Sequence, residues 1–274
     1  MSQQHRARKR FGQHFLQDHN VVARMVMCID PVPDDRLVEI GPGLGVLTHE
    51  LLSRVPRLDV VELDRDIIPK LARSCGPLGE LTIHEADALK FDFGALADTG
   101  RPLRVVGNLP YNISTPLMFH LLGYRDLIRD MHFMLQKEVV DRLAASPGSR
   151  DYGRLGVMMQ YFCDVEPLFD VPPEAFAPPP KVDSAVVRLV PHVQPPVSVA
   201  DVVLLERVVV QAFTQRRKTL RNTLKPLFSA DALASLGIDP VRRAETLSLA
   251  EFAALANALS ETAEGGVSDT APRD

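Results

Sequence analysis

The sequence has few cysteines and no long apolar run, and both absences restrict the class of protein. Its 274 residues include only three cysteines, Cys28, Cys75 and Cys163, an odd number spread widely along the chain. They form neither a disulfide framework nor a metal cluster, so no metal is expected and a reducing cytoplasm is the expected compartment. No segment approaches the roughly 18 apolar residues of a membrane span, and no apolar run of signal-peptide length follows the basic N-terminal segment.

Net positive charge is also absent, since the formal charge is −4. Alone, this balance argues against a nucleic-acid partner, because a phosphate backbone requires cationic neutralisation. Two segments nevertheless contain basic residues and no acid, and both indicate a polyanion-binding surface. They are residues 1–17, with Arg6, Arg8, Lys9 and Arg10, and residues 215–225, with Arg216, Arg217, Lys218, Arg221 and Lys225. The alternative for each is a solvated helix face or a terminus without a partner.

Short apolar runs alternate with segments of helical length. This alternation is typical of a mostly parallel, doubly wound α/β sheet, and the chain length suits one such domain with a smaller appendage. The expected strands are 36–40, 58–63, 81–85, 103–107, 131–136 and 184–190. The expected helices are 20–29, 45–54, 67–74, 114–123 and 137–145.

Proline marks the segments that follow. Prolines crowd between Val165 and Val182, which predicts an extended segment lying against the sheet rather than a helix. The stretch PHVQPP at 191–196 predicts a linker, and helical patterns at 204–224 and 248–259 predict a small all-helical domain. The expected division is therefore 1–192, 193–262 and a disordered tail over 263–274.

A glycine-rich loop follows the first of these strands, in VEIGPGLGVLT. Gly41, Gly43 and Gly45 lie between a strand and a helix, where the backbone can approach a nucleotide-like cofactor closely. The dinucleotide-binding fingerprint requires a glycine at the position of Val46. Its absence favours a methyltransferase over a dehydrogenase.

Acids follow the next two strands. Glu62 closes the second strand, where a carboxylate can accept hydrogen bonds from both hydroxyls of a ribose. Asp87, after the third strand, can accept from the adenine amino group of a cofactor. The alternatives are an ordinary surface acid at Glu62 and a turn residue at Asp87.

The fourth strand ends in Asn108-Leu109-Pro110-Tyr111. An adenine amine is a poor nucleophile because its lone pair is delocalised into the ring. The Asn108 side-chain oxygen and the Leu109 carbonyl, stiffened by Pro110, can accept from the two N–H groups and aim the lone pair at a sulfonium methyl. The ring of Tyr111 can stack on an extruded base. The alternative is a simple Asn-x-Pro turn, but active sites of open α/β sheets gather at the carboxyl ends of the strands.

At these residues the chain resembles the bacterial 16S ribosomal RNA adenine dimethyltransferases. The resemblance covers nearly the whole chain, through KRFGQHFLQD, VEIGPGLG, VVELDRD, GNLPYNISTPLMFHLL, MHFMLQKEV, YGRLGVMMQY, PPPKVDSAVVRLVP and FTQRRKTLRN. It implies a Rossmann-like class I methyltransferase sheet with a small C-terminal helical domain, S-adenosyl-L-methionine as cofactor, and a monomer. The implied substrate is two adjacent adenosines in the 3′-terminal hairpin of 16S rRNA in the 30S subunit or its precursor, dimethylated at N6.

The resemblance also implies roles for individual residues. The implied cofactor site contains His14, Leu16, Gly41, Gly43, Glu62, Asp87 and Asn108. The family usually has Asn where this chain has His14, whose imidazole can also donate or accept a hydrogen bond. Phe176 is the candidate for a second aromatic wall at the adenine, and the alternative is a core phenylalanine that anchors the proline-rich loop. A helix carrying Arg216, Arg217, Lys218 and Arg221 is expected to bind RNA.

Two other functions stay open at this point. One is the related methyltransferase of large-subunit ribosomal RNA that confers macrolide resistance, which shares the fold and the Asn-x-Pro-aromatic site. The QRRKTLRN and PPPKVDSAVVRLVP segments favour the small-subunit enzyme. The other is a ribosome-assembly factor without catalytic activity, against which the intact Glu62, Asp87 and Asn108–Tyr111 argue.

Overall fold

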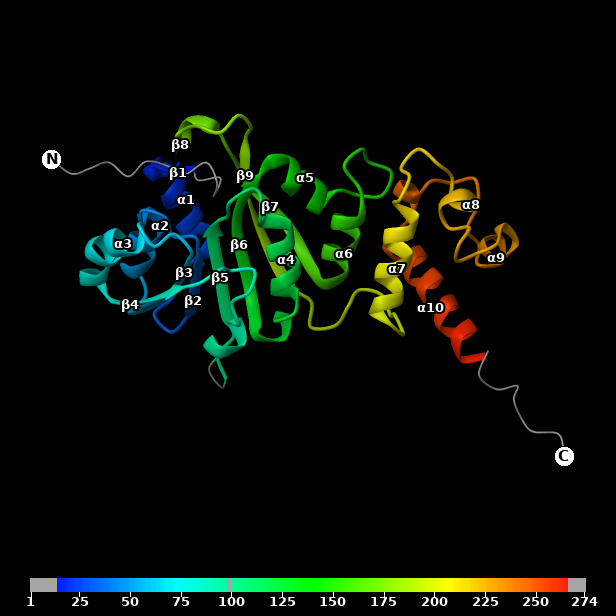
Figure 1. The fold of residues 1–274 in the computed structure, drawn as a ribbon, viewed down its shortest axis with the longest axis horizontal. Coiled ribbons are helices and arrows are strands. Elements are labelled where there is room, and N and C mark those ends of the chain that lie inside the picture. The colour runs from blue at the N-terminus through cyan, green and yellow to red at the C-terminus, as the bar shows by residue number, and fades with distance from the viewer. Residues whose placement is uncertain (1–13, 98–99, 266–274) are drawn as a thin grey trace. The chain divides into compact units, whose positions relative to one another are not determined.

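A computed structural model of the chain describes residues 14–97 and 100–265, so the basic residues Arg6 to Arg10 lie outside the described part. It contains two compact units, one within residues 1–140 and 164–191 and the other within 141–163 and 192–274. The predicted domains 1–192 and 193–262 differ from this division, because residues 141–163 belong with the C-terminal helices. Figure 1 follows the element order in colour.

The first unit is built on a seven-stranded sheet with the order β4-β3-β2-β5-β6-β9-β7. Its strands are β2 (Arg36–Ile40), β3 (Arg57–Glu62), β4 (Glu80–Glu85), β5 (Leu103–Asn108), β6 (Ile128–Gln136), β7 (Cys163–Val171) and β9 (Ser184–Pro191). Strands β2 to β6 pair in parallel, and β9 pairs antiparallel to β6. The chain winds outward from β2 to β4 and then returns to β5, so the strand order reverses between β2 and β5. The predicted mostly parallel, doubly wound α/β sheet is confirmed.

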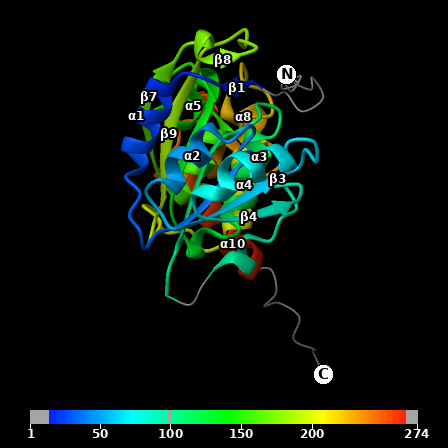
Figure 2. The same ribbon diagram turned by 90° about the vertical axis from the view of Figure 1, so that its left-hand side faces the viewer.

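Both faces of this sheet are covered, because the central strands are buried along almost their whole length. The helices of this unit are α1 (His19–Ile29), α2 (Val46–Leu52), α3 (Ile68–Cys75), α4 (Ser114–Leu122) and the first half of α5 (Lys137–Ala144), and its short 3₁₀ turns are η2 (Gly76–Leu78), η3 (Phe93–Leu96), η4 (Arg125–Leu127) and η5 (Pro173–Ala175). Figure 2 views them from the side of α3 and β4.

Helix α1 shows how the local sequence sets one of these elements. The Asp18 side chain caps its first turn by accepting from the Asn20 and Val21 amides. Its buried residues recur at helical spacing and enter the core beneath the sheet. They are Val21, Val22, Met25, Val26 and Ile29.

The proline-rich segment differs in part from its prediction. Instead of only lying against the sheet, residues 163–171 form β7, the edge strand beyond β9. Pro167 is tolerated there because an edge strand has one side without ladder partners. Further on, β8 (Phe176–Ala177) pairs antiparallel with β1 (Phe15–Leu16), so the segment before α1 is bound to the proline-rich loop.

The second unit is helical. It contains the end of α5, then α6 (Arg154–Phe162), α7 (Val202–Ala212), α8 (Leu220–Thr223), α9 (Ala230–Ser235), the 3₁₀ turn η6 (Ala244–Thr246) and α10 (Leu249–Gly265). The sequence pattern missed α6 and α9. Helix α10 includes the first residues of the predicted tail, whose remainder, 266–274, lies outside the described residues. None of the described helices is long and apolar enough to cross a membrane.

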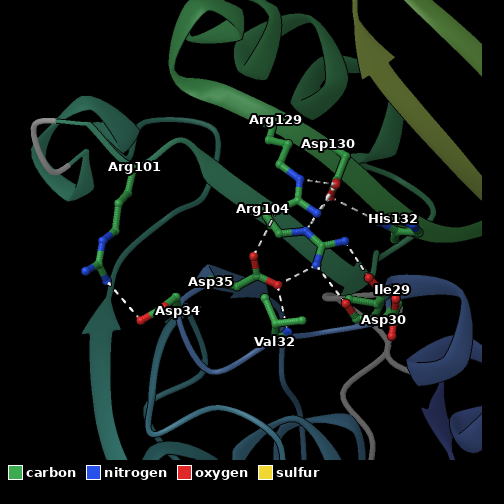
Figure 3. A network of polar contacts seen from close by, with 10 residues as sticks. All are labelled: Ile29, Asp30, Val32, Asp34, Asp35, Arg101, Arg104, Arg129, Asp130 and His132. Carbon is green, nitrogen blue, oxygen red and sulfur yellow. Dashed lines mark hydrogen bonds and ion pairs between the residues drawn. The ribbon is translucent and has the colours of Figure 1, made fainter.

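A buried ionic network joins α1 to the amino ends of β5 and β6 (Figure 3). Arg104, 3% exposed, donates to both Asp130 oxygens at 3.0 and 3.1 Å and to Asp35 at 2.6 Å. Its remaining donors reach the Asp30 carbonyl at 3.2 Å and the Ile29 carbonyl. Arg104 thus provides hydrogen-bond donors for the carbonyls at the C-terminal end of α1. The network lies at the amino ends of β5 and β6, on the opposite side of the sheet from their carboxyl ends.

Candidate active site

A cavity lies where β2, β3 and β5 end. The cavity lies at the carboxyl ends of the central strands, where the strand order reverses between β2 and β5. Open α/β sheets usually bind their ligands at this point. All seven residues expected to bind a cofactor line the cavity: His14, Leu16, Gly41, Gly43, Glu62, Asp87 and Asn108. Leu109, Pro110 and Tyr111 line it as well, so the structure brings the two groups of candidates together.

The glycine loop needs its glycines at two positions for separate reasons. Gly43 has φ +55°, and a Cβ there would lie 3.2 Å from the ring of Phe15, in the strap of residues 14–16 that crosses the loop. Gly45 has φ +88° at the start of α2, and a Cβ there would lie 2.7 Å from both Cys75 Sγ and Leu71 Cδ1. A side chain at either position would strain the backbone and collide with the side chains packed against the loop.

Glu62 is buried, with 8% exposure, and two backbone amides hold its carboxylate. Oε2 accepts from Gly43 N at 3.3 Å and Oε1 accepts from Asp64 N at 2.8 Å. Burial raises the pKa of Glu62, while these hydrogen bonds oppose the shift. Because each carboxylate oxygen has further acceptor capacity, Glu62 can still accept from a diol in the cavity.

Asp87 makes a local turn contact and also faces the cavity. Its Oδ1 accepts from Leu89 N at 3.0 Å, which is the local bond of a turn residue. The residue also lines the cavity and is partly buried.

The Asn108–Tyr111 segment runs from the end of β5 to the start of α4. Leu109 N donates to Met134 O at 3.1 Å, and Ile113 N donates to Pro110 O at 3.1 Å, so the backbone is fixed on both sides of Pro110. The Asn108 amide nitrogen donates to the His14 carbonyl at 3.2 Å. This contact orients the amide so that its oxygen stays available as an acceptor.

His14 contacts several parts of the site at once. Its Nδ1 lies 2.7 Å from Pro178 O, and its ring stacks on that of Tyr111 with centroids 5.7 Å apart and planes at 27°. Together with the bond to Asn108, these contacts join the strap to the proline-rich loop and to the Asn108–Tyr111 segment.

The structure does not bring Phe176 into the cavity. The ring is 4% exposed and packs in the core cluster, and Phe176 pairs with Leu16 in the short β1–β8 ladder. This placement corresponds to the alternative of a core phenylalanine that anchors the proline-rich loop.

Sequence reasoning missed Glu39, which also lines the cavity. It is 2% exposed, and Thr48 Oγ1 donates to its Oε2 at 2.7 Å. Burial raises the pKa of Glu39 to about 8, with the Thr48 hydrogen bond opposing and the nearby charge of Glu62 adding to the shift. The available signal was an acid within the otherwise apolar strand LVEI.

The basic candidates lie in the second unit, but not on one helix as expected. Helix α7 ends at Ala212, residues 213–219 form turns, and only Arg221 lies in a helix, α8. Thr214 donates its hydroxyl to Gln211 O at the end of α7. Thr219 is the N-cap residue of α8, but its hydroxyl accepts from Asn222 Nδ2 at 3.1 Å and does not cap the helix.

These cations differ in their pairing. Arg216 lies 3.3 Å from Glu245 and also donates to the Arg150 carbonyl. Arg217, Lys218 and Arg221 are exposed, and within the described part of the chain none of them has an ion-pair partner. The loop therefore presents three uncompensated charges to a polyanion.

The sequence is similar to one family of ribosomal RNA methyltransferases over almost its whole length. The sequence profile described as "Ribosomal RNA adenine dimethylase" matches residues 4–261. The chain is 59% identical over 259 residues, covering 94% of it and 95% of the relative, to ribosomal RNA small subunit methyltransferase A of Yersinia pestis strain Pestoides F, and equally to that of Yersinia pseudotuberculosis serotype O:1b.

Solved structures agree with these relatives. A dimethyladenosine transferase from Plasmodium falciparum matches with a TM-score of 0.77 and 26% identity, covering 92% of this chain and 98% of that one. The 23S rRNA methyltransferase ErmE matches with a TM-score of 0.69 and 25% identity, covering 90% and 99%.

Proposed function

The chain belongs to the ribosomal RNA adenine dimethylase family, and on that premise we propose that it dimethylates N6 of two adjacent adenosines in the 3′-terminal hairpin of 16S rRNA, with S-adenosyl-L-methionine as methyl donor. One observation carries the proposal. Asn108 and Leu109, the proposed acceptors, line the same cavity as Glu62 and the glycine loop, which supports a base site beside a cofactor site.

The cavity residues suit S-adenosyl-L-methionine. Glu62 would hold the ribose hydroxyls, Asp87 would accept from the adenine amine, and the glycine loop admits a ligand close to its backbone. Apolar Leu63 and Leu89 would flank the adenine ring. When bound, the cofactor supplies an electrophilic methyl group on a sulfonium.

Replacing Glu62 with alanine is expected to weaken cofactor binding by about 2–3 kcal/mol, the scale for losing a charged acceptor of hydrogen bonds. Calorimetric titration with S-adenosylmethionine measures this directly. Glu50→Ala is the matched control, because Glu50 is a partly exposed acid on α2 outside the cavity. Equal affinities of the Glu62→Ala variant and the wild type would remove the ribose assignment.

The protein's contribution to chemistry is to shape the attacking amine. Asn108 Oδ1 and the Leu109 carbonyl would accept from its two N–H groups, so that the lone pair leaves the plane of the base and faces the methyl group. The amine proton passes to solvent after charge develops on nitrogen, so no general base is needed. In the second transfer the monomethylated amine has one N–H left, which one acceptor holds while the methyl group takes the place of the other hydrogen.

The loop 213–219 and Arg221 would bind the phosphate backbone of the RNA. Charge reversal of Arg217 and Lys218 to glutamate is expected to weaken small-subunit binding and to lower its salt dependence. The log–log slope should fall by roughly 0.7 per lost contact to single-stranded RNA and by about 0.9 per contact to duplex. Binding measured across a salt series gives this slope.

Reversal of Lys70 and Arg73 to glutamate is the control for that experiment. These exposed cations lie on α3 in the first unit, and the change in net charge is the same. If both double variants shift the slope equally, the effect is one of net charge and the loop is not the RNA contact.

Separated, unmethylated ribosomal subunits test the function itself. We expect incorporation of methyl groups into the small subunit, with mass mapping that places dimethyladenosine at two adjacent positions. Incorporation into 23S rRNA instead would indicate the large-subunit methyltransferase, and cofactor binding without incorporation would indicate an assembly factor.

A further inference from the structure

The hydroxyl of Tyr111 has a partner that the stacking role does not require. Its Oη lies 2.7 Å from Ser184 Oγ, across 73 positions of sequence. Ser184 has 0% exposure and does not line the cavity, so it touches neither a cofactor nor a substrate there. Any effect it has on the site passes through Tyr111.

Ser184 is itself held rigidly. It opens β9 and pairs with Gln136 at the end of β6, while the preceding residue, Asp183, accepts from Lys137 N at 2.9 Å. A hydroxyl on this frame can fix the far end of another side chain with little freedom of its own.

Tyr111 is held at its near end as well. Ser114 Oγ, which belongs to a residue 2% exposed, donates to the Tyr111 carbonyl at 3.1 Å. A tyrosine side chain has two rotatable bonds before its ring, and fixing both the backbone and the hydroxyl defines the plane of the ring. Burial raises the pKa of the Tyr111 phenol, with the Ser184 hydrogen bond opposing, so the hydroxyl stays protonated at neutral pH and keeps its donor.

We propose that Ser184 is a positioning residue of the adenine site, whose hydroxyl anchors the phenol of Tyr111 and so sets the plane on which the extruded base stacks. The consequence for turnover rests on the proposed function, whereas the anchor itself does not. Since base–aromatic stacking depends on parallel planes, a ring released from Ser184 spends less time in the productive orientation.

Fluorine NMR tests the anchor without RNA. The chain contains four tyrosines, so labelling with 3-fluorotyrosine gives few signals, and Tyr111→Phe identifies that of Tyr111. We expect Ser184→Ala to shift and narrow the Tyr111 signal, because the ring becomes more mobile. The signals of Tyr124, Tyr152 and Tyr161 serve as internal controls and should not move. An unchanged Tyr111 signal would overturn the anchor.

Single-turnover methylation tests the consequence. Ser184→Ala is expected to slow methyl transfer about 3–10-fold, the scale for one buried hydrogen bond, with unchanged cofactor affinity. Tyr111→Phe removes the same bond from its other side, so the double variant should be no slower than the slower single one. Multiplying effects would overturn the proposal. A wild-type protein inactive on small subunits would reject the proposed function while leaving the fluorine result to decide on the anchor.

Discussion

Replacing Asn108 with alanine is expected to lower kcat by about 10²–10³-fold, the scale for removing one preorganised polar group from a reacting centre. The side-chain oxygen would accept from the amine in the transition state, where charge develops on nitrogen, more strongly than in the ground state. The loss should therefore fall on the chemical step and not on RNA affinity. Single-turnover methylation of small subunits at saturating cofactor measures that step.

The contact of Asn108 with the strap provides a second comparison. Because its amide nitrogen donates to the His14 carbonyl, alanine removes a donor as well as an acceptor. Asn108→Asp keeps an acceptor but loses that donor, so it should be less damaging to the chemical step than alanine. Asn20→Ala, an exposed substitution on α1, serves as the control.

Cofactor affinity decides between the two roles of Asn108. If Asn108→Ala weakens S-adenosylmethionine binding and turnover recovers fully at saturation, Asn108 acts by holding the strap and the acceptor role is wrong. We expect turnover to remain low at saturation.

The sequence predicted the central sheet well because its strands are buried on both faces. Short, mostly apolar runs mark β2, β3 and β5, and the expected limits differ from the observed ones by a residue or less. Strand β7 was harder because only its two ends are buried, and CDVEPLFDV combines acids with a proline. The strand with which β7 pairs, β9, lies further along the chain, so the local sequence of β7 does not predict the pairing.

The site shows the same distinction between local and distant signals. Asn108 to Tyr111 are consecutive, so a site at this segment could be proposed from the sequence alone, and the structure places all four residues at the cavity. The contact of Tyr111 with Ser184 and that of His14 with Pro178 join residues 73 and 164 positions apart. A serine or a histidine so far along the chain from its partner belongs to no sequence motif that would predict the contact. The basic loop was misread because cations spaced along QRRKTLRN fit a helix face, whereas α7 ends at Ala212 and the Thr214 hydroxyl donates back to Gln211 O.

The second large effect is expected far from the cavity, at Arg104. Arg104→Met should destabilise the folded chain by about 3–5 kcal/mol, since it leaves buried Asp35 and Asp130 without their main cationic partner. It also removes donors from the Asp30 and Ile29 carbonyls at the end of α1. Urea unfolding followed by far-UV circular dichroism measures the loss.

Arg129→Met is the matched control for that change. Arg129 contacts the same two carboxylates, Asp35 at 3.0 Å and Asp130 at 3.4 Å, but its side chain is 52% exposed. Water can replace an exposed guanidinium, so this variant should lose only about 0.2–1 kcal/mol. Equal losses in the two variants would mean that burial of Arg104 is not the source of the stability.

Lowering the pH should reduce the difference in free energy of unfolding between Arg104→Met and the wild type. Burial alone would raise the pKa of Asp130, but the His132 imidazole, whose Nδ1 lies 3.5 Å from Oδ1, and the hydrogen bonds and charge of Arg104 lower it below its ordinary value. A lowered pKa contributes stability that is present above the unfolded-state pKa, about 3.9 for an aspartate, and that is lost as the pH falls through the folded value. In Arg104→Met the Asp130 carboxyl keeps only the half-exposed Arg129 as a cationic partner. It therefore takes up a proton more readily, which relieves the cost of burying its charge. The two unfolding curves should therefore converge as the pH is lowered from 7 toward about 4, and a difference that stays constant over this range would show that the carboxylates are not what Arg104 stabilises.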